Sequence, residues 1–375
     1  MSYLAGFLGV LLVAFTLIDA FEVVLLPRPV RRRIRLHRYF FKITWGVWRR
    51  VAQRWPRGPA REDFIGVYGP LSMVMIFALW AVCLIAGFGL LQWAVQSPST
   101  GDQWQSLASE MIVSGDAFFT LGYGDIVPRN AMARLLVILE AGTGFGFIAL
   151  TVGYLPVLYQ HFVRRDLQLI EFTARAGARP TAAALLAWHA QGTPEQLDRW
   201  LRDWEVWACD IVESHSVYPM LAFYRSQHEG QSWLAALAVV LDTCALLITG
   251  REESTELQSA ATFSAARRVL DEISQSLRVG IEPHRPDRRL PVGKLERLSP
   301  IIARVVPGWQ DDAATLQALG KLTRSYEPQL ESLAAYLLLD LPEWIADDAP
   351  LPAAHFGRDQ LIAQLTHGRA DSRDV

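Results

Sequence analysis

Three stretches of the chain are apolar and long enough to cross a lipid bilayer, which takes about 20 residues of helix. They run from Tyr3 to Leu26, from Tyr68 to Val95 and from Ala133 to Tyr159. The first has no basic region before it, and its basic residues follow it, so we expect a retained span rather than a cleaved signal peptide. Asp19 and Glu22 lie in its last third. We expect them at the membrane interface, with a neighbouring helix or a cation path as alternatives.

Aromatic and basic residues alternate at helical spacing between the first two spans. The pattern from Leu36 to Trp55 predicts an amphipathic helix that can lie among lipid headgroups. Twelve Lys and Arg and no Asp or Glu occur from Arg28 to Arg61. Such a segment favours contact with anionic lipid and belongs on the cytoplasmic side of the membrane. The helix either transmits movement to the second span or only anchors the topology.

A short glycine-containing motif stands between the second and third spans. Gln105 to Phe119 predicts a short helix, and Thr120-Leu121-Gly122-Tyr123-Gly124-Asp125 follows it. Glycine adopts backbone angles that other residues resist. Consecutive carbonyl oxygens can therefore point to one axis, with the Thr120 hydroxyl below them. Rings of such oxygens replace the water shell of a potassium ion.

This motif resembles the filter of the potassium-channel superfamily, Thr-Val-Gly-Tyr-Gly-Asp, with Leu121 in place of Val. The resemblance covers about residues 65 to 163 and is to bacterial channels with two transmembrane helices and one pore loop. It implies that K⁺ is the permeant ion and that no other cofactor is needed. One filter segment per chain supplies a quarter of a ring, so a homotetramer is expected. The residues implied to coordinate K⁺ are Thr120, Leu121, Gly122, Tyr123 and Gly124.

The resemblance also implies roles for residues around the filter. Asp116 is expected to hydrogen-bond to Asp125, directly or through water, and to brace the filter; the alternative is that it faces solvent or packs on the membrane side. Leu121 should contribute its carbonyl and bury its side chain. Glu140, in the third span, should pack behind the filter or face polar partners.

The third span contains a predicted hinge and gate. Gly144 lies at the offset where the resembling channels bend their inner helix, whereas Gly142 and Gly146 suit close helix packing. Pro156 should kink the inner end. Leu155 and Tyr159 are candidates for an apolar constriction.

Charge sets the expected orientation. With the basic segment inside the cell, the N-terminus and the pore loop lie outside, and the C-terminal half is cytoplasmic. The resemblance to bacterial channels further implies that this multi-pass protein lies in the inner membrane. The predicted parts are an N-terminal transmembrane helix (1–27), a basic linker (28–63), a pore domain (64–163) and a helical regulatory domain (164–375).

The C-terminal half reads as further helices, so the predicted fold class is all-α. A capping box at Thr193 to Gln196 opens one helix with a tryptophan stripe, which we interpret as packing. Ser232 to Thr249 is interpreted as a buried core helix rather than a fourth span. Gly280 to Gly308 reads as a connection, followed by helices at Ala313 to Ser325 and Pro328 to Leu341.

Composition narrows the function classes. The 375 residues are 51% hydrophobic and carry a net charge of −2, and the three cysteines form no metal-binding spacing. No dinucleotide fingerprint, P-loop, EF-hand or catalytic arrangement occurs, so we expect neither an enzyme nor a nucleic-acid partner. The C-terminal half is expected to bind a regulatory ligand that the sequence does not identify. The alternative function is a membrane-anchored scaffold or receptor with a non-conducting or poorly selective pore.

Overall fold

The computed structural model describes most of the chain as helices. The described residues are 2–26, 35–96, 106–176, 180–190, 192–228, 231–250, 253–281 and 312–344, with 289, 299, 302–303, 306 and 309–310. Within them there is no strand, which confirms the all-α prediction. Four basic residues of the linker (Arg28, Arg31, Arg32 and Arg33) and much of the predicted 280–308 connection lie outside the described residues. The chain forms two compact units, residues 1–161 and 162–375.

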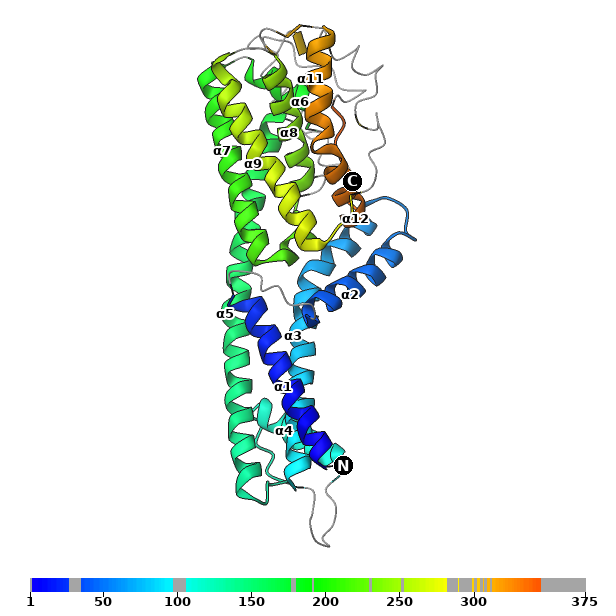
Figure 1. Ribbon diagram of the computed structural model, residues 1–375, viewed down its shortest axis with the longest axis vertical. Coiled ribbons are helices and arrows are strands. Elements are labelled where there is room, and N and C mark those ends of the chain that lie inside the picture. Colours follow the sequence, from blue (N-terminus) through cyan, green and yellow to red (C-terminus); the bar gives the residue numbers. More distant parts are fainter. Residues whose placement is uncertain are drawn as a thin grey trace. The chain divides into compact units, whose positions relative to one another are not determined.

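The first unit holds the three predicted spans. Its helices are α1 (Ser2–Val24), α2 (Leu36–Ala52), α3 (Pro59–Gln96), α4 (Leu107–Phe118) and the first part of α5 (Ala131–Ala176) (Figure 1). Helices α1, α3 and α5 are long and apolar enough to cross a membrane. The prediction ended the third span at Tyr159, but α5 continues to Ala176 with Pro156 inside it. Residues 160–176 contain no Gly or Pro, so the helix continues into the second unit.

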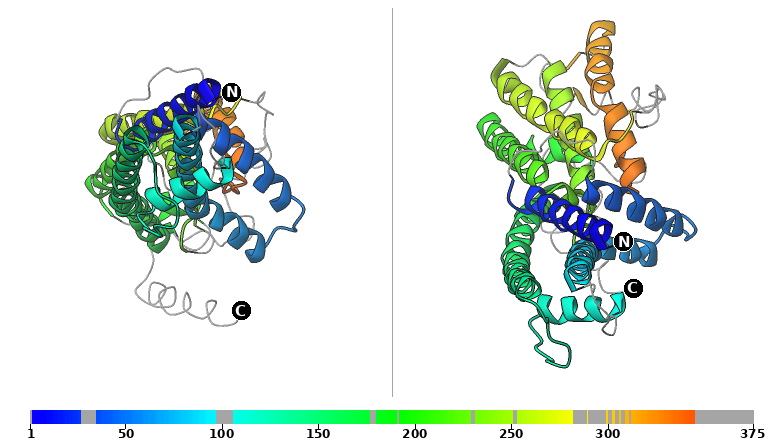
Figure 2. Two further views of the ribbon diagram at one scale, coloured as in Figure 1. Left: turned by 90° about the horizontal axis from the view of Figure 1, so that it is seen from below. Right: turned by 60° about the horizontal axis from the view of Figure 1, so that its bottom comes forward.

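Helices α1 and α3 lie side by side at very short separation (Figures 1 and 2). A Cβ atom added at Gly9 would lie 2.7 Å from the carbonyl oxygen of Gly87. One added at Gly87 would lie 2.6 Å from a methyl group of Val13. Small residues thus let the two backbones approach, as is usual where helices pack within a membrane.

Asp19 joins three helices, which agrees with the alternative that it faces a neighbouring helix. Its carboxylate is 3% exposed and accepts hydrogen bonds from the Leu36 and His37 amides at 3.0 and 3.1 Å. It also accepts from Trp80 Nε1 at 3.0 Å and lies 2.9 Å from His37 Nδ1. Asp19 of α1 therefore satisfies the free amides in the first turn of α2, a role that a local N-cap usually fills.

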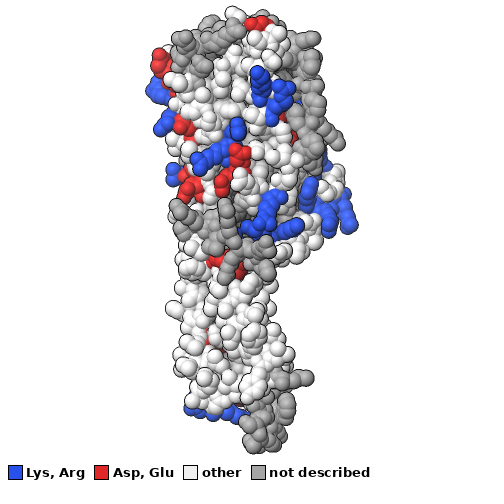
Figure 3. All heavy atoms as spheres, viewed as in Figure 1, with Lys and Arg blue, Asp and Glu red and all other residues white. Residues whose placement is uncertain are grey.

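The predicted amphipathic helix is present as α2. Trp45 is buried against Tyr68, with ring centroids 4.8 Å apart. Trp48 stacks on Phe64 at 4.4 Å and donates to its carbonyl at 3.1 Å. These aromatic residues fix α2 along the start of α3. In Figure 3, Lys and Arg side chains gather over α2, whereas the surface over α1 is almost free of charge.

The second unit is a helical bundle. Its helices are the end of α5, α6 (Ala182–His189), α7 (Pro194–Val217), the 3-10 helix η1 (Pro219–Phe223), α8 (Trp233–Thr249), α9 (Glu253–Leu277), α11 (Ala313–Arg324) and α12 (Glu327–Leu337). Helices α7 and α9 run side by side (Figures 1 and 2). The capping box at Thr193 is confirmed. Along α8 every residue except Ala235 and Ile248 is buried, so this helix forms the core of the unit.

A buried ionic cluster joins α8, α12 and Arg289 in this bundle. Arg289 contacts Asp242 of α8 at 2.5 Å and Glu327 of α12 at 2.9 Å. The Tyr326 hydroxyl donates to Asp242 at 2.6 Å. Asp242, which interrupts the apolar sequence of α8, is therefore paired rather than isolated, as a buried charge must be.

Candidate functional site

The filter motif begins where α4 ends. Ser106 caps the start of α4, accepting a hydrogen bond from the Ser109 amide at 3.1 Å. At the other end, the Thr120 amide donates to the Ala117 carbonyl and the Leu121 amide to the Asp116 carbonyl, at 3.1 and 2.9 Å. Thr120 has a φ of 52°. These features together form a Schellman motif, with a threonine where glycine is usual. The chain thus leaves the helix sharply at Thr120.

Both filter glycines adopt the left-handed conformation. Gly122 and Gly124 each have a φ of 73°. Residues with side chains rarely accept this angle, so the motif needs glycine at these two positions. The structure agrees with the expectation that the glycines depart from an ordinary strand. Alternation of left-handed glycines with other residues turns successive peptide groups away from the strand pattern.

Asp116 reaches the filter through a backbone contact. Its carboxylate accepts a hydrogen bond from the Tyr123 amide at 3.0 Å. The Asp125 carboxylate accepts from the Ile126 amide, also at 3.0 Å. Among the described residues no direct hydrogen bond joins Asp116 to Asp125, and their expected interaction through water stays a prediction. Asp116 therefore contacts the filter motif through a main-chain donor.

Gly144 lies against the end of α4. A Cβ atom at this position would be 2.0 Å from the Phe118 carbonyl oxygen and 2.8 Å from its carbon. Such distances exclude any side chain without movement of the backbone. At Gly142 and Gly146, by contrast, an added Cβ would meet nothing within 4 Å in the chain. Close packing was predicted for those two, but in one subunit it occurs at Gly144.

Glu140 is fully buried and faces polar partners, which is one of the two placements expected for it. Gln92 of α3 donates to its carboxylate at 2.7 Å, and the Ser114 hydroxyl of α4 contacts it directly. Ser114 also lies 2.7 Å from the Ile85 carbonyl oxygen. The Glu140 carboxylate thus connects α3, α4 and α5 in the first unit. The sequence singled out Glu140 but offered no means to identify its partners.

A second polar network, which the sequence interpretation missed, joins the end of α3, the helix α4 and the start of α5. Gln96 donates to Glu110 of α4 at 2.8 Å and accepts from the Arg129 amide at 3.0 Å. Asn130 caps α5 by accepting from the Ala133 amide at 2.7 Å, and donates to the Val95 carbonyl at 3.2 Å. The available signal was the Asn at the start of an apolar helix, a typical N-cap. The network holds together both chain segments that flank the filter.

The filter and the predicted gate are exposed in a single subunit. Leu121 is 54% exposed and Tyr123 is 70% exposed. The Leu121 side chain is therefore not buried within one chain, and its burial in an assembled filter stays a prediction. Leu155, Pro156 and Tyr159 also lie on an exposed side of α5.

Comparison with known proteins agrees with this geometry. Residues 72–160 match the family described as "Ion channel". The Bacillus subtilis (strain 168) protein described as "Uncharacterized membrane protein YdjJ" is 23% identical over 215 residues. That alignment covers 56% of this chain and 62% of the relative. No solved structure matches the chain.

The family match begins in α3 and ends in α5, so it encloses α4, the filter motif and the contacts of Asp116, Glu140 and Gly144. The relative is itself a membrane protein by its description, and three helices of this chain are able to cross a membrane. Residues 72–160 are therefore similar to the ion channel family, within a chain that is a membrane protein.

Proposed function

We propose that the chain is one subunit of a homotetrameric, potassium-selective channel that conducts K⁺ passively. The observation that carries this proposal is the conformation of the filter motif: left-handed glycines at 122 and 124, separated by Tyr123, whose amide is held by Asp116. A filter needs its amide hydrogens turned outward so that its carbonyl oxygens line the axis. The Asp116 contact supplies an outward acceptor for one of these amides. K⁺ would be coordinated by Thr120, Leu121, Gly122, Tyr123 and Gly124.

The surfaces of one subunit support assembly with further copies. In the most apolar window of α5 only 11% of residues are buried, compared with 44% in α3. Phe145 and Val152 are 71% and 66% exposed on this helix. Lipid or neighbouring subunits must cover such surfaces in a membrane. One chain cannot form a ring of carbonyl oxygens. Further copies of the chain would complete the ring and would also cover exposed filter residues such as Tyr123.

Gating is proposed to run through α5. This helix begins just after the filter and continues to Ala176 in the second unit. The helix would bend at Gly144, and Pro156, nearer the end of α5, would lower the free-energy cost of bending. This bend would move the apolar residues Leu155 and Tyr159. In this proposal residues 164–375 sense a cytoplasmic ligand and bias that bend. In this proposal the protein lies in a bacterial inner membrane, and its N-terminus is on the outer side of that membrane.

Anionic lipid is proposed as a partner of α2. Tyr39, Ile43 and Val47 recur at four-residue spacing and are each more than half exposed. They share the helix with Lys42 and Arg50, which are also exposed. An apolar stripe flanked by cations is the pattern of a helix that lies in the headgroup region.

Potassium efflux from vesicles tests this function. The full-length protein would be reconstituted into vesicles of phosphatidylethanolamine and phosphatidylglycerol loaded with K⁺ and diluted into Na⁺. We expect K⁺ efflux, and no comparable Na⁺ efflux from Na⁺-loaded vesicles. Equal efflux of both ions would contradict potassium selectivity. Absence of any flux from correctly folded protein would favour the scaffold or receptor function.

A further inference from the structure

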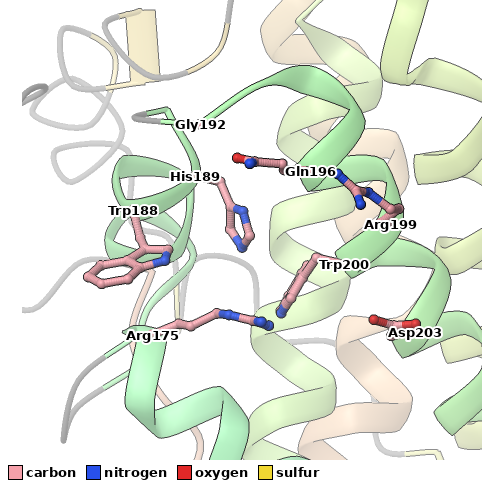
Figure 4. A pocket seen from close by; sticks show the side chains of 8 residues that line it. All are labelled: Arg175, Trp188, His189, Gly192, Gln196, Arg199, Trp200 and Asp203. Carbon is pink, nitrogen blue, oxygen red and sulfur yellow. The ribbon is translucent and has the colours of Figure 1, made fainter.

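A recessed cavity in the second unit combines cationic and aromatic side chains (Figure 4). It has a volume of about 620 Å³, within the range of small-molecule sites. Three helix ends form it: the end of α5, the end of α6 and the first turns of α7. The residues that matter to the argument are Arg175, Trp188, His189, Arg199 and Trp200.

Two tryptophans provide flat apolar surface in this cavity. Trp188 is partly exposed, whereas Trp200 is 3% exposed. The His189 ring packs near Trp200, with centroids 5.2 Å apart. Aromatic side chains of this kind favour a flat ring in the ligand, through stacked or edge-on contact.

Two arginines give the cavity its positive charge. Arg199 is exposed on α7, donates through Nε to the Glu195 carbonyl at 3.2 Å and forms no ion pair with a described residue. Arg175 is paired with Glu171 at 2.7 Å. Asp203 is the one carboxylate among the lining residues that the structure describes. A guanidinium fork binds carboxylate or phosphate in preference to neutral groups.

Polar atoms without partners face the same space. Trp200 Nε1 and His189 Nε2 are both buried and have no hydrogen-bond partner in the structure. Burial, and to a lesser extent Arg175, lower the pKa of His189 to about 4, so its imidazole is neutral at pH 7. Buried polar atoms are normally satisfied, and an unsatisfied pair beside a cavity indicates a missing acceptor and donor.

We propose that this cavity binds a small planar aromatic anion, a ring that carries a carboxylate or phosphate group. Arg199 would be the main contact of the acid group, with Arg175 as the second. Trp188 and Trp200 would hold the ring, and Trp200 Nε1 would donate to a polar atom on it. Binding of this ligand does not depend on the proposed channel function, although Arg175 belongs to the helix that the channel proposal uses for gating.

Isothermal titration of the full-length protein tests the proposal, with anthranilate as the carboxylate probe and phenyl phosphate as the phosphate probe. We expect at least one of them to bind, and the neutral isostere 2-aminobenzamide and the non-aromatic acid hexanoate to bind at least about tenfold more weakly. The Arg199→Gln variant should weaken binding of the anion about tenfold. Arg199 is exposed, so this variant is expected to fold.

Arg202→Gln is the matched control, because Arg202 lies on the same helix, is 62% exposed and pairs with Glu205 outside the cavity. It should leave binding unchanged. Trp188→Leu should weaken binding of the aromatic anion and leave the weak binding of hexanoate unaltered. The proposal is overturned if neither anion binds, if the neutral isostere binds equally well, or if the two arginine variants behave alike.

Discussion

At the residue scale, Gly144 has a packing requirement that its expected role as a hinge did not reveal. The carbonyl oxygen of Phe118 occupies the space of a Cβ atom, with a separation of 2.0 Å. The offset from the filter identified this glycine, but only the structure shows that the end of α4 lies against it. Packing and bending requirements can coincide, because both favour the smallest residue.

We expect Gly144→Ala to displace the end of α4 and with it the filter. Overpacking of this kind costs about 1–3 kcal/mol. The thermal midpoint of the solubilised protein should fall and K⁺ flux should decrease. Gly146→Ala is the control, because a Cβ atom added at Gly146 has no other atom of the chain within 4 Å. Equal effects of the two variants would show that the close contact with Phe118 is unimportant.

Asp116 supports the filter at one main-chain amide, that of Tyr123. Removing the acceptor in Asp116→Ala should loosen the filter and speed its inactivation by a few-fold to about tenfold, the range expected for one hydrogen bond. Asp116→Asn keeps an acceptor oxygen and should have a smaller effect. Current decay after channel opening in planar bilayers measures this. An unchanged rate in the alanine variant would remove Asp116 from the filter's support.

At the element scale, the sequence revealed the three long apolar helices and the start of α7, but not which helices pack against them. Hydropathy located α1, α3 and α5, and Thr193 to Gln196 located the start of α7, because these signals are local. The hydrogen bonds of Glu140 with Gln92 and of Asp19 with Trp80 depend on which helices pack together and with which faces. The sequence does not show this. Helices α6 and α9 were not assigned individually, because α9 is polar over much of its length and α6 is short.

The buried ionic cluster of α8 and α12 should make the second unit sensitive to pH. Burial is the main reason that the pKa of Glu327 is raised from 4.5 to about 7, and Arg289 opposes this shift. The folded unit then binds a proton that the unfolded chain releases near pH 4.5. Stability from this group is therefore complete below pH 4.5 and is lost as pH rises towards 7.

We expect the unfolding midpoint of the second unit to rise when the pH is lowered from 8 to 6. Burial also raises the pKa of Asp242, so that residue contributes in the same direction. Glu327→Gln should reduce the pH dependence without removing it. Differential scanning calorimetry at several pH values tests this, and a midpoint that falls on acidification in the wild type would contradict the assignment.

At the scale of the whole molecule, the residues of the filter motif are exposed in a single chain, as the proposed assembly requires. Leu121 and Tyr123 have no cover within the chain, and α5 is the least buried of the three apolar helices. Sequence could not show this directly, although one motif per chain already implied a ring of four. In the proposed channel, contacts between subunits would therefore determine whether the filter forms.

Native mass spectrometry of the detergent-solubilised protein tests the assembly. We expect a complex of four chains, each of 42.0 kDa. Gly144→Ala should lower the proportion of this complex, because the filter lies at its centre. A stable dimer or monomer as the principal species would contradict the proposed pore.

The central claim is potassium selectivity, and the reversal potential tests it most directly. Purified full-length protein in a planar bilayer would face K⁺ on one side and Na⁺ on the other. We predict a reversal potential close to the potassium equilibrium value. A clear current that reverses near zero would contradict the claim, because it would show that the filter from Thr120 to Gly124 does not distinguish K⁺ from Na⁺.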